Sequence, residues 1–139
     1  MRTWAAAFEL PPRFFTFEGV GMSAYDGLTQ VSTAQVVTAN AAQAASPVPC
    51  ETHNEAEAYI VASAVGGTTP TVTPVLESSP DGTNWFTLQA GTAITANGNQ
   101  RIAAAGNLGR FLRVNYGSVG GTTPTFTFNT WIHTKRAGV

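Results

Sequence analysis

The segment Gly66-Gly67-Thr68-Thr69-Pro70-Thr71 recurs as Gly120-Gly121-Thr122-Thr123-Pro124-Thr125, and this repeat decides the fold class. Glycine close to threonine and proline is typical of a turn between strands. Each copy has, on both sides, a short run rich in Val, Ile, Phe and Thr, the residue types that favour β-strands. The sequence therefore predicts two strand–turn–strand units.

Aligning the two units predicts which side chains form the core. Residues two positions apart in a strand share a face. The expected inward set is Ile60, Ala62, Val72, Pro74, Val114, Tyr116, Phe126 and Phe128. The expected outward set is Arg113, Asn115, Thr127 and Asn129. Pro74 has no N–H, so its strand is expected at a sheet edge or bulged there. One core shared by two units predicts an all-β fold, a two-sheet antiparallel β-sandwich of jelly-roll-like form.

Two further turns complete the expected architecture of about eight strands. Ser79-Pro80-Asp81-Gly82 has the residues of a tight turn. Asn97-Gly98, between Thr92–Thr95 and Arg101–Ala103, predicts a hairpin. The residues expected to form structural turns are Gly66, Gly67, Pro70, Pro80, Asp81, Gly82, Gly120, Gly121 and Pro124.

Residues 1–34 differ in character from residues 35–139, which carry the strand signals. They show no sustained periodicity and are rich in aromatic residues, which a free, solvated tail would lack. We expect an irregular N-terminal arm that forms an interface, followed by the β-sandwich domain. Two interpretations stay open: the arm packs on its own domain, or it docks on another subunit. Its interface residues are Trp4, Phe8, Phe14, Phe15, Phe17 and Tyr25.

The composition of the chain gives little reason to expect binding to nucleic acid or membrane. Charged residues are 11% of the 139 residues and the net charge is −1, against about 25% charged residues in an average soluble domain. Such a charge gives little attraction to nucleic acid or an anionic membrane. No apolar run reaches the roughly 20 residues that span a bilayer. The low charge fits a robust or extracellular surface, or one covered by neighbouring subunits.

The sequence offers no convergent set of catalytic or metal-binding groups. Cys50 is the only cysteine, and His53 and His133 lack metal-ligand spacing. Cys50 and His53 could be a nucleophile and its base, but nothing around them supports that chemistry. We therefore expect no enzymatic activity, no cofactor and no metal site.

Trp131 is the best candidate for binding a ligand or partner. Strand alternation places it with Asn129 and His133, opposite Phe128 and Ile132. An exposed tryptophan could stack on a sugar ring, or it could be covered by the arm or by a neighbouring subunit. Trp85 is expected to pack under the turn that precedes it.

Ser79-Pro80-Asp81-Gly82-Thr83-Asn84-Trp85, the flanking repeat copies and Gly109-Arg110-Phe111-Leu112-Arg113-Val114 resemble a group of small structural proteins of tailed bacteriophages. The resemblance covers roughly residues 36–134. Thr stands here for the usual Ser in both repeat copies, and Phe111 stands where Tyr is frequent.

This resemblance implies a β-sandwich component of a virion. We expect a capsid decoration or cement protein, made in the host cytoplasm and bound to the capsid exterior. Its partners would be the major capsid protein and copies of itself, a trimer by analogy, with no nucleic acid or membrane. The alternative is a carbohydrate-binding or tail- or fibre-associated module for host attachment, whose partner would be a glycan.

Overall fold

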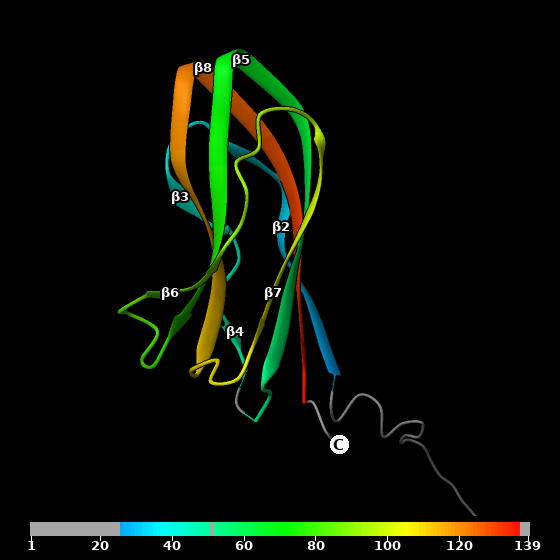
Figure 1. The fold of residues 1–139 in the computed structure, drawn as a ribbon, viewed down its shortest axis with the longest axis vertical. Helices are drawn as coiled ribbons and strands as arrows, with labels where there is room; N and C mark the ends of the chain where they lie inside the picture. The colour runs from blue at the N-terminus through cyan, green and yellow to red at the C-terminus, as the bar shows by residue number, and fades with distance from the viewer. Residues whose placement is uncertain (1–25, 51, 137–139) are drawn as a thin grey trace, which may run out of the picture.

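The computed structural model describes residues 26–50 and 52–136, and it confirms the all-β class (Figure 1). The strands are β2 (Asp26–Val37), β3 (Ala41–Ala42), β4 (Val48–Pro49), β5 (Glu55–Ser79), β6 (Phe86–Ala90), β7 (Gly98–Ala105) and β8 (Phe111–Lys135). No helix in this part of the chain is long and apolar enough to cross a membrane.

Within the described residues, all seven strands belong to one antiparallel sheet, built around the 25-residue strands β5 and β8. Both long strands bend over at the top of Figure 1, so the sheet folds back on itself. The first layer contains β7, the first half of β5, the second half of β8, and β2. The second layer contains β6, the other halves of β5 and β8, and β3 with β4. One folded sheet thus stands where two separate sheets were expected.

The prediction that the two GGTTPT segments are turns between strands is wrong. Each lies inside a long strand, and the two pair with each other, with Gly66 opposite Thr125 and Thr71 opposite Gly120. The register shifts four times between Ser63 and Thr73, which bends the strands without reversing them. Local sequence cannot separate a bend from a reversal, because both need glycine. We call this paired region the corner.

Glycine is required at two equivalent positions of the corner. Gly67 and Gly121 both have φ +102°, which L-residues with side chains rarely adopt. A Cβ on Gly67 would lie 2.5 Å from the carbonyl oxygen of Thr123, and a Cβ on Gly121 would lie 2.5 Å from that of Thr69. The backbones of β5 and β8 therefore approach each other at a distance that excludes any side chain.

The predicted hairpin at Asn97-Gly98 is also wrong. β7 begins at Gly98 but pairs with residues 55–62 of β5, and residues 92–95 contribute only an isolated bridge between Ile94 and Val72. The side-chain oxygen of Asn97 instead accepts the backbone N–H of Val65 (2.9 Å) in the bulged part of β5. A backbone donor without a ladder partner needs such an acceptor.

The corner relates the two halves of the chain by an approximate two-fold symmetry. Asn40, just before β3, accepts the N–H of Val119 at 2.9 Å, as Asn97, just before β7, does for Val65. Ala64 and Ser118 have matching positive φ values of 50° and 53°. β2, β3–β4 and β5 therefore correspond to β6, β7 and β8.

The core lies between the two layers and contains the side chains expected there. Every residue of the predicted inward set is buried, and the outward set is partly exposed. Tyr116 stacks on Phe128 with ring centroids 4.2 Å apart, and its hydroxyl bonds Ser32 (2.8 Å) and Thr130 (2.7 Å). The buried hydroxyl is thus satisfied from two strands.

Pro74 lies inside the sheet, so of the two expectations for its strand, a sheet edge or a bulge, the edge is wrong. Its carbonyl accepts the N–H of Gly91, and β6 begins to pair only at the next residue, Val75. In an antiparallel strand the N–H and C=O of one residue point to the same side. The N–H that Pro74 lacks would therefore point to the β6 side, where β6 offers no ladder partner. The register shift between Thr71 and Thr73 ends one residue before it.

The boundary expected at residue 34 is too late, because β2 already begins at Asp26. Two register shifts in β2 place Val31 and Ser32 next to each other in the interior, which hides the strand's alternation in the sequence. The arm residues Trp4, Phe8, Phe14, Phe15, Phe17 and Tyr25 lie outside the described residues.

Candidate interaction face

The outer face of the first layer brings together the polar and aromatic residues that the sequence singled out. Asn129, Trp131 and His133 alternate along β8 with the fully buried Phe128 and Ile132, as predicted. Register on β5 pairs Tyr59 with Trp131, Val61 with Asn129 and Glu57 with His133. Tyr59 and Trp131 thus form a cross-strand aromatic pair that faces outward. We call this surface the outer face.

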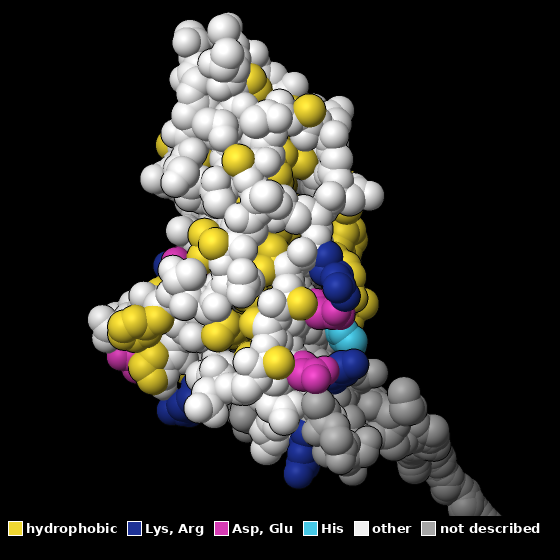
Figure 2. Space-filling view, in the orientation of Figure 1, with side chains coloured by type: hydrophobic (Ala, Val, Ile, Leu, Met, Phe, Trp, Pro, Cys, Tyr) yellow, Lys and Arg dark blue, Asp and Glu magenta, His cyan; other side chains and the backbone are white. Residues whose placement is uncertain are grey.

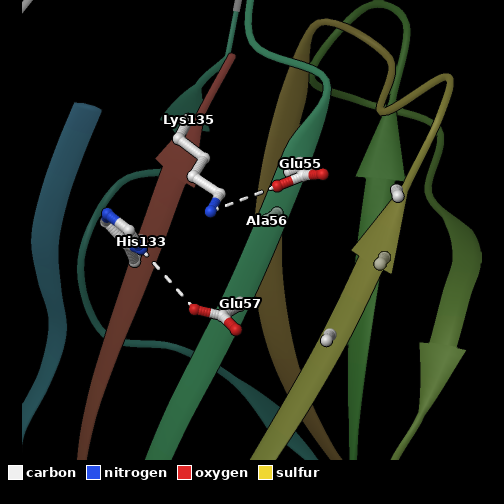
Figure 3. Close-up of a pocket in the computed structure, with 8 residues that line it drawn as sticks. Glu55, Ala56, Glu57, His133 and Lys135 are labelled. Atoms are coloured by element: carbon white, nitrogen blue, oxygen red, sulfur yellow. Dashed lines mark ion pairs between the residues drawn. The ribbon is translucent and has the colours of Figure 1, made fainter. Parts of the chain in front are cut away.

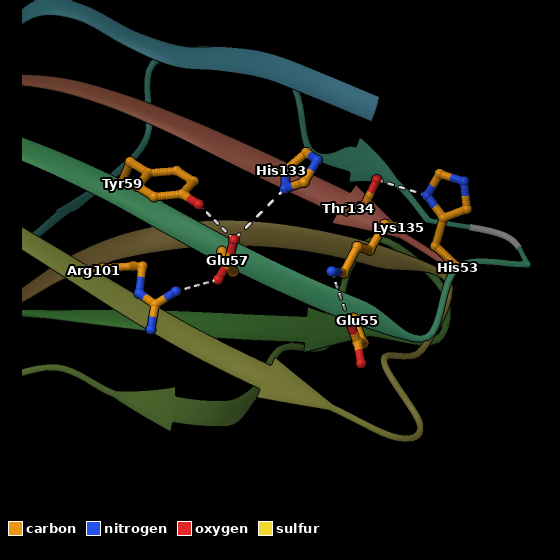
Figure 4. A network of polar contacts seen from close by, with 8 residues as sticks. All are labelled: His53, Glu55, Glu57, Tyr59, Arg101, His133, Thr134 and Lys135. Carbon is orange, nitrogen blue, oxygen red and sulfur yellow. Dashed lines mark hydrogen bonds and ion pairs between the residues drawn. The ribbon is translucent and has the colours of Figure 1, made fainter. Parts of the chain in front are cut away.

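Glu57 is the centre of a polar network on the outer face (Figure 4). Its carboxylate accepts the Tyr59 hydroxyl and an Arg101 N–H, and it lies 3.6 Å from His133 Nδ1. The hydrogen bond from Tyr59 and the nearby Arg101 charge hold the pKa of Glu57 below its usual value. The same hydrogen bond raises the pKa of Tyr59. Glu57 is therefore a satisfied anion and is poorly suited to be a general base.

A shallow hollow lies beside this network, between β5, β7 and β8 (Figure 3). It is lined by Ala103, Ala104 and Ala105 of β7 and by charged residues that include a Lys135–Glu55 ion pair of 3.4 Å. In residues 26–50 and 52–136 no group of three or more His, Cys, Asp or Glu could hold a metal ion. The hollow offers small apolar side chains and paired charges.

Exposed apolar side chains concentrate on the outer face. Leu28 is 66% exposed and Val36 is 64% exposed, and both pair with outward residues of β8. Tyr59 lies on β5, between β8 and β7, and is 37% exposed. Three of the four large hydrophobic residues exposed in the described chain therefore share this face, the fourth being Phe86 on β6. A cluster of this kind indicates a contact surface.

Among the described residues, charged side chains lie in the half of the molecule away from the corner. The described charged side chains are Glu55, Glu57, Glu77, Asp81, Arg101, Arg110, Arg113, Lys135 and Arg136. No Asp, Glu, Lys or Arg occurs from Ala58 to Leu76 or from Val114 to Thr134, the stretches that form the corner. In Figure 2 the upper part of the molecule correspondingly shows no charged side chain. We call this half the uncharged end.

The second layer carries its own aromatic and cationic contacts. The Arg113 guanidinium lies 4.3 Å from the centre of the Trp85 ring and 2.7 Å from a Glu77 oxygen. The Trp85 ring, expected under the turn that precedes it, thus lies against Arg113 of β8. The turn itself is confirmed: Asp81 accepts the N–H groups of Thr83 and Asn84 at 2.8 Å, and Gly82 has φ +80°.

Cys50 and His53, the pair considered for nucleophilic chemistry, each form a side-chain hydrogen bond with another residue. The Cys50 thiol is buried and donates to the carbonyl of Gly109 (3.0 Å). The His53 ring bonds the Thr134 hydroxyl at 2.7 Å (Figure 4). The two side chains therefore hydrogen-bond to different residues.

Comparison of the chain with protein-family models, with curated proteins and with solved structures found no match. The outer face therefore has to be interpreted from its own chemistry. Sequence reasoning missed the roles of Tyr59, Arg101 and Leu28. Glu55, Glu57, Tyr59 and Val61 alternate along β5. This alternation could have placed Tyr59 opposite Trp131, had the pairing of β5 with β8 been recognised.

Proposed function

We propose that this protein is a structural component of a virion, a capsid decoration protein that binds the outer capsid surface. The observation that carries the proposal is the uncharged end. The centres of protein interfaces are depleted of charge, because an unpaired charge loses its hydration on binding. A folded β-structure with one uncharged end is suited to seat that end on another protein.

The corner gives this end the stiffness that a bracing element needs. Two continuous strands cross it, so its shape is held by backbone hydrogen bonds and by the fit of Gly67 and Gly121 against the facing carbonyls. Many copies, each adding a modest contact, would stabilise a shell through multivalency. The resemblance of residues 36–134 to small phage structural proteins supports the same role.

The experiment compares two lysine variants in binding to undecorated heads. Thr38, exposed directly after β2 at the uncharged end, is changed to Lys, and the matched control is Thr87→Lys, exposed on β6 at the charged end. We expect Thr38→Lys to weaken head binding at least about tenfold, since a buried unpaired charge costs several kcal/mol. Thr87→Lys should bind as the parent does. Equal binding by both variants would contradict the proposal that the uncharged end contacts the capsid.

The alternative function is glycan binding at the outer face, and the pairing of Tyr59 with Trp131 favours it. Aromatic rings beside amide and charged groups, here Asn129 and Arg101, are the groups that orient ligands in binding sites. The test measures binding of the parent and of Trp131→Ala to host surface polysaccharides. Saturable binding that Trp131→Ala abolishes supports this function, whereas no binding by the parent rejects it.

A further inference from the structure

We infer that residues 1–25 of one copy dock on the outer face of a second copy, so that the protein assembles by exchange of its N-terminal segments. The inference deepens the proposed function and rests on it for the expectation that the protein works as an assembly. The contact would bury the aromatic residues of the segment against the apolar side chains of that face. These side chains are Leu28, Val36, Tyr59 and Trp131.

The described chain begins at the charged end of the sheet. Asp26 pairs with Lys135, the last residue of β8, so the chain enters β2 at the charged end of the sheet. From there β2 runs toward the corner. An extended segment of 25 residues reaches about 80 Å. That length is enough for the segment to reach the outer face of a second copy.

The composition of the segment matches the exposed side chains of the outer face. The segment contains Trp4, Phe8, Phe14, Phe15 and Phe17, a density of aromatic residues that requires burial. The outer face presents Leu28 and Val36 at the two ends of β2, each about two-thirds exposed, with Tyr59 on the neighbouring part of the sheet. Symmetric exchange would let each copy both give a segment and receive one.

The test uses the full chain and identifies which molecule the segment touches. Phe15 is replaced by the photo-reactive benzoylphenylalanine in unlabelled protein, which is mixed with an equal amount of nitrogen-15-labelled parent and irradiated. We expect cross-links from the probe to labelled peptides of β2 or β8. Cross-links confined to the probe's own chain, cross-links to other surfaces, or no cross-link at all would overturn the inference.

A second measurement tests the outer face through variants that leave the core unchanged. Leu28→Asp combined with Val36→Asp should raise the dissociation constant of the assembly at least about tenfold, measured by sedimentation equilibrium. The matched control is Phe86→Asp on the second layer, at a residue that is 61% exposed, and it should assemble as the parent does. A monomeric parent, or equal effects of both variants, would contradict the inference. Neither measurement contains capsid, so failure here leaves the head-binding proposal to its own experiment.

Discussion

Thr68 and Thr122 are direct partners at the centre of the corner, and the pairs on either side of them are related by symmetry. Gly66 faces Thr125 on one side, and Gly120 faces Thr71 on the other. The two copies of one hexapeptide thus pair with each other in antiparallel orientation. The repeat that is visible in the sequence is the physical contact that folds the sheet into two layers.

Replacing Gly67 with Ala should destabilise the fold by about 2 kcal/mol or more, because a strained backbone alone costs about 1–3 kcal/mol and the new Cβ meets a carbonyl oxygen. Gly121→Ala should behave alike, since its φ value and its nearest contact are the same. The control is Gly98→Ala, where a Cβ would meet nothing within 4 Å. The free energy of unfolding is measured in denaturant. Equal stability of the Gly67 and Gly98 variants would show that the corner tolerates a side chain.

Asn97→Ala and Asn40→Ala should each lower the free energy of unfolding by about 1 kcal/mol, the net value of one hydrogen bond. Each change removes the acceptor of one bulge N–H, that of Val65 or that of Val119. Asn107→Ala, at an exposed position in the loop before β8, serves as the control. If the two Asn variants differed strongly, the equivalence of the two halves of the corner would be lost.

Tyr116→Phe should cost about 1–2 kcal/mol of stability, because the Thr130 and Ser32 hydroxyls lose a buried partner. Burial also raises the pKa of Tyr116 above its ordinary value of 10.0. The neutral phenol is favoured in the folded state, so its stabilising effect is complete below pH 10.0 and declines as the pH rises toward the folded-state pKa.

Unfolding measured between pH 9 and pH 11 checks this linkage. The parent should lose stability through that range more steeply than Tyr116→Phe, which lacks the titrating group. Parallel pH profiles for the parent and Tyr116→Phe would be inconsistent with a buried, hydrogen-bonded phenol.

Asp81 should titrate well below its ordinary pKa of 3.8, since the N–H groups of Asn84 and Thr83 donate to its carboxylate. A lowered pKa in the folded state stabilises the protein above pH 3.8, and this effect is lost as the pH falls toward the folded-state pKa. Carboxyl carbon chemical shifts followed by NMR give the value directly. A midpoint near 3.8 would mean that the turn does not hold the charged form.

The residue pattern predicted the core well because strand alternation is a local property. The burial of Ile60, Val114 and Phe128 follows from counting positions by two on either side of the repeat. The partners of the strands were predicted less well. A glycine-rich segment has the same residue pattern whether the chain reverses or bends there. Only contact with the other copy of the hexapeptide, distant in the sequence, selects the bend.

The same limit explains the partial success at the outer face. Alternation placed Asn129, Trp131 and His133 together, but Glu57, Tyr59 and Arg101 join them only through the pairing of β5 with β8 and β7. The start of β2 was hidden because its register shifts break the alternation near Val31. Local pattern therefore predicted faces, while long-range pairing decided which faces meet.

The measurement that tests the central claim most directly is co-sedimentation of the purified full chain with undecorated heads from the source particle. A capsid decoration protein should bind saturably and at a fixed ratio to the major capsid subunit. No sedimentation of the protein at micromolar concentration would contradict it and would leave glycan binding at Tyr59 and Trp131 as the function to pursue.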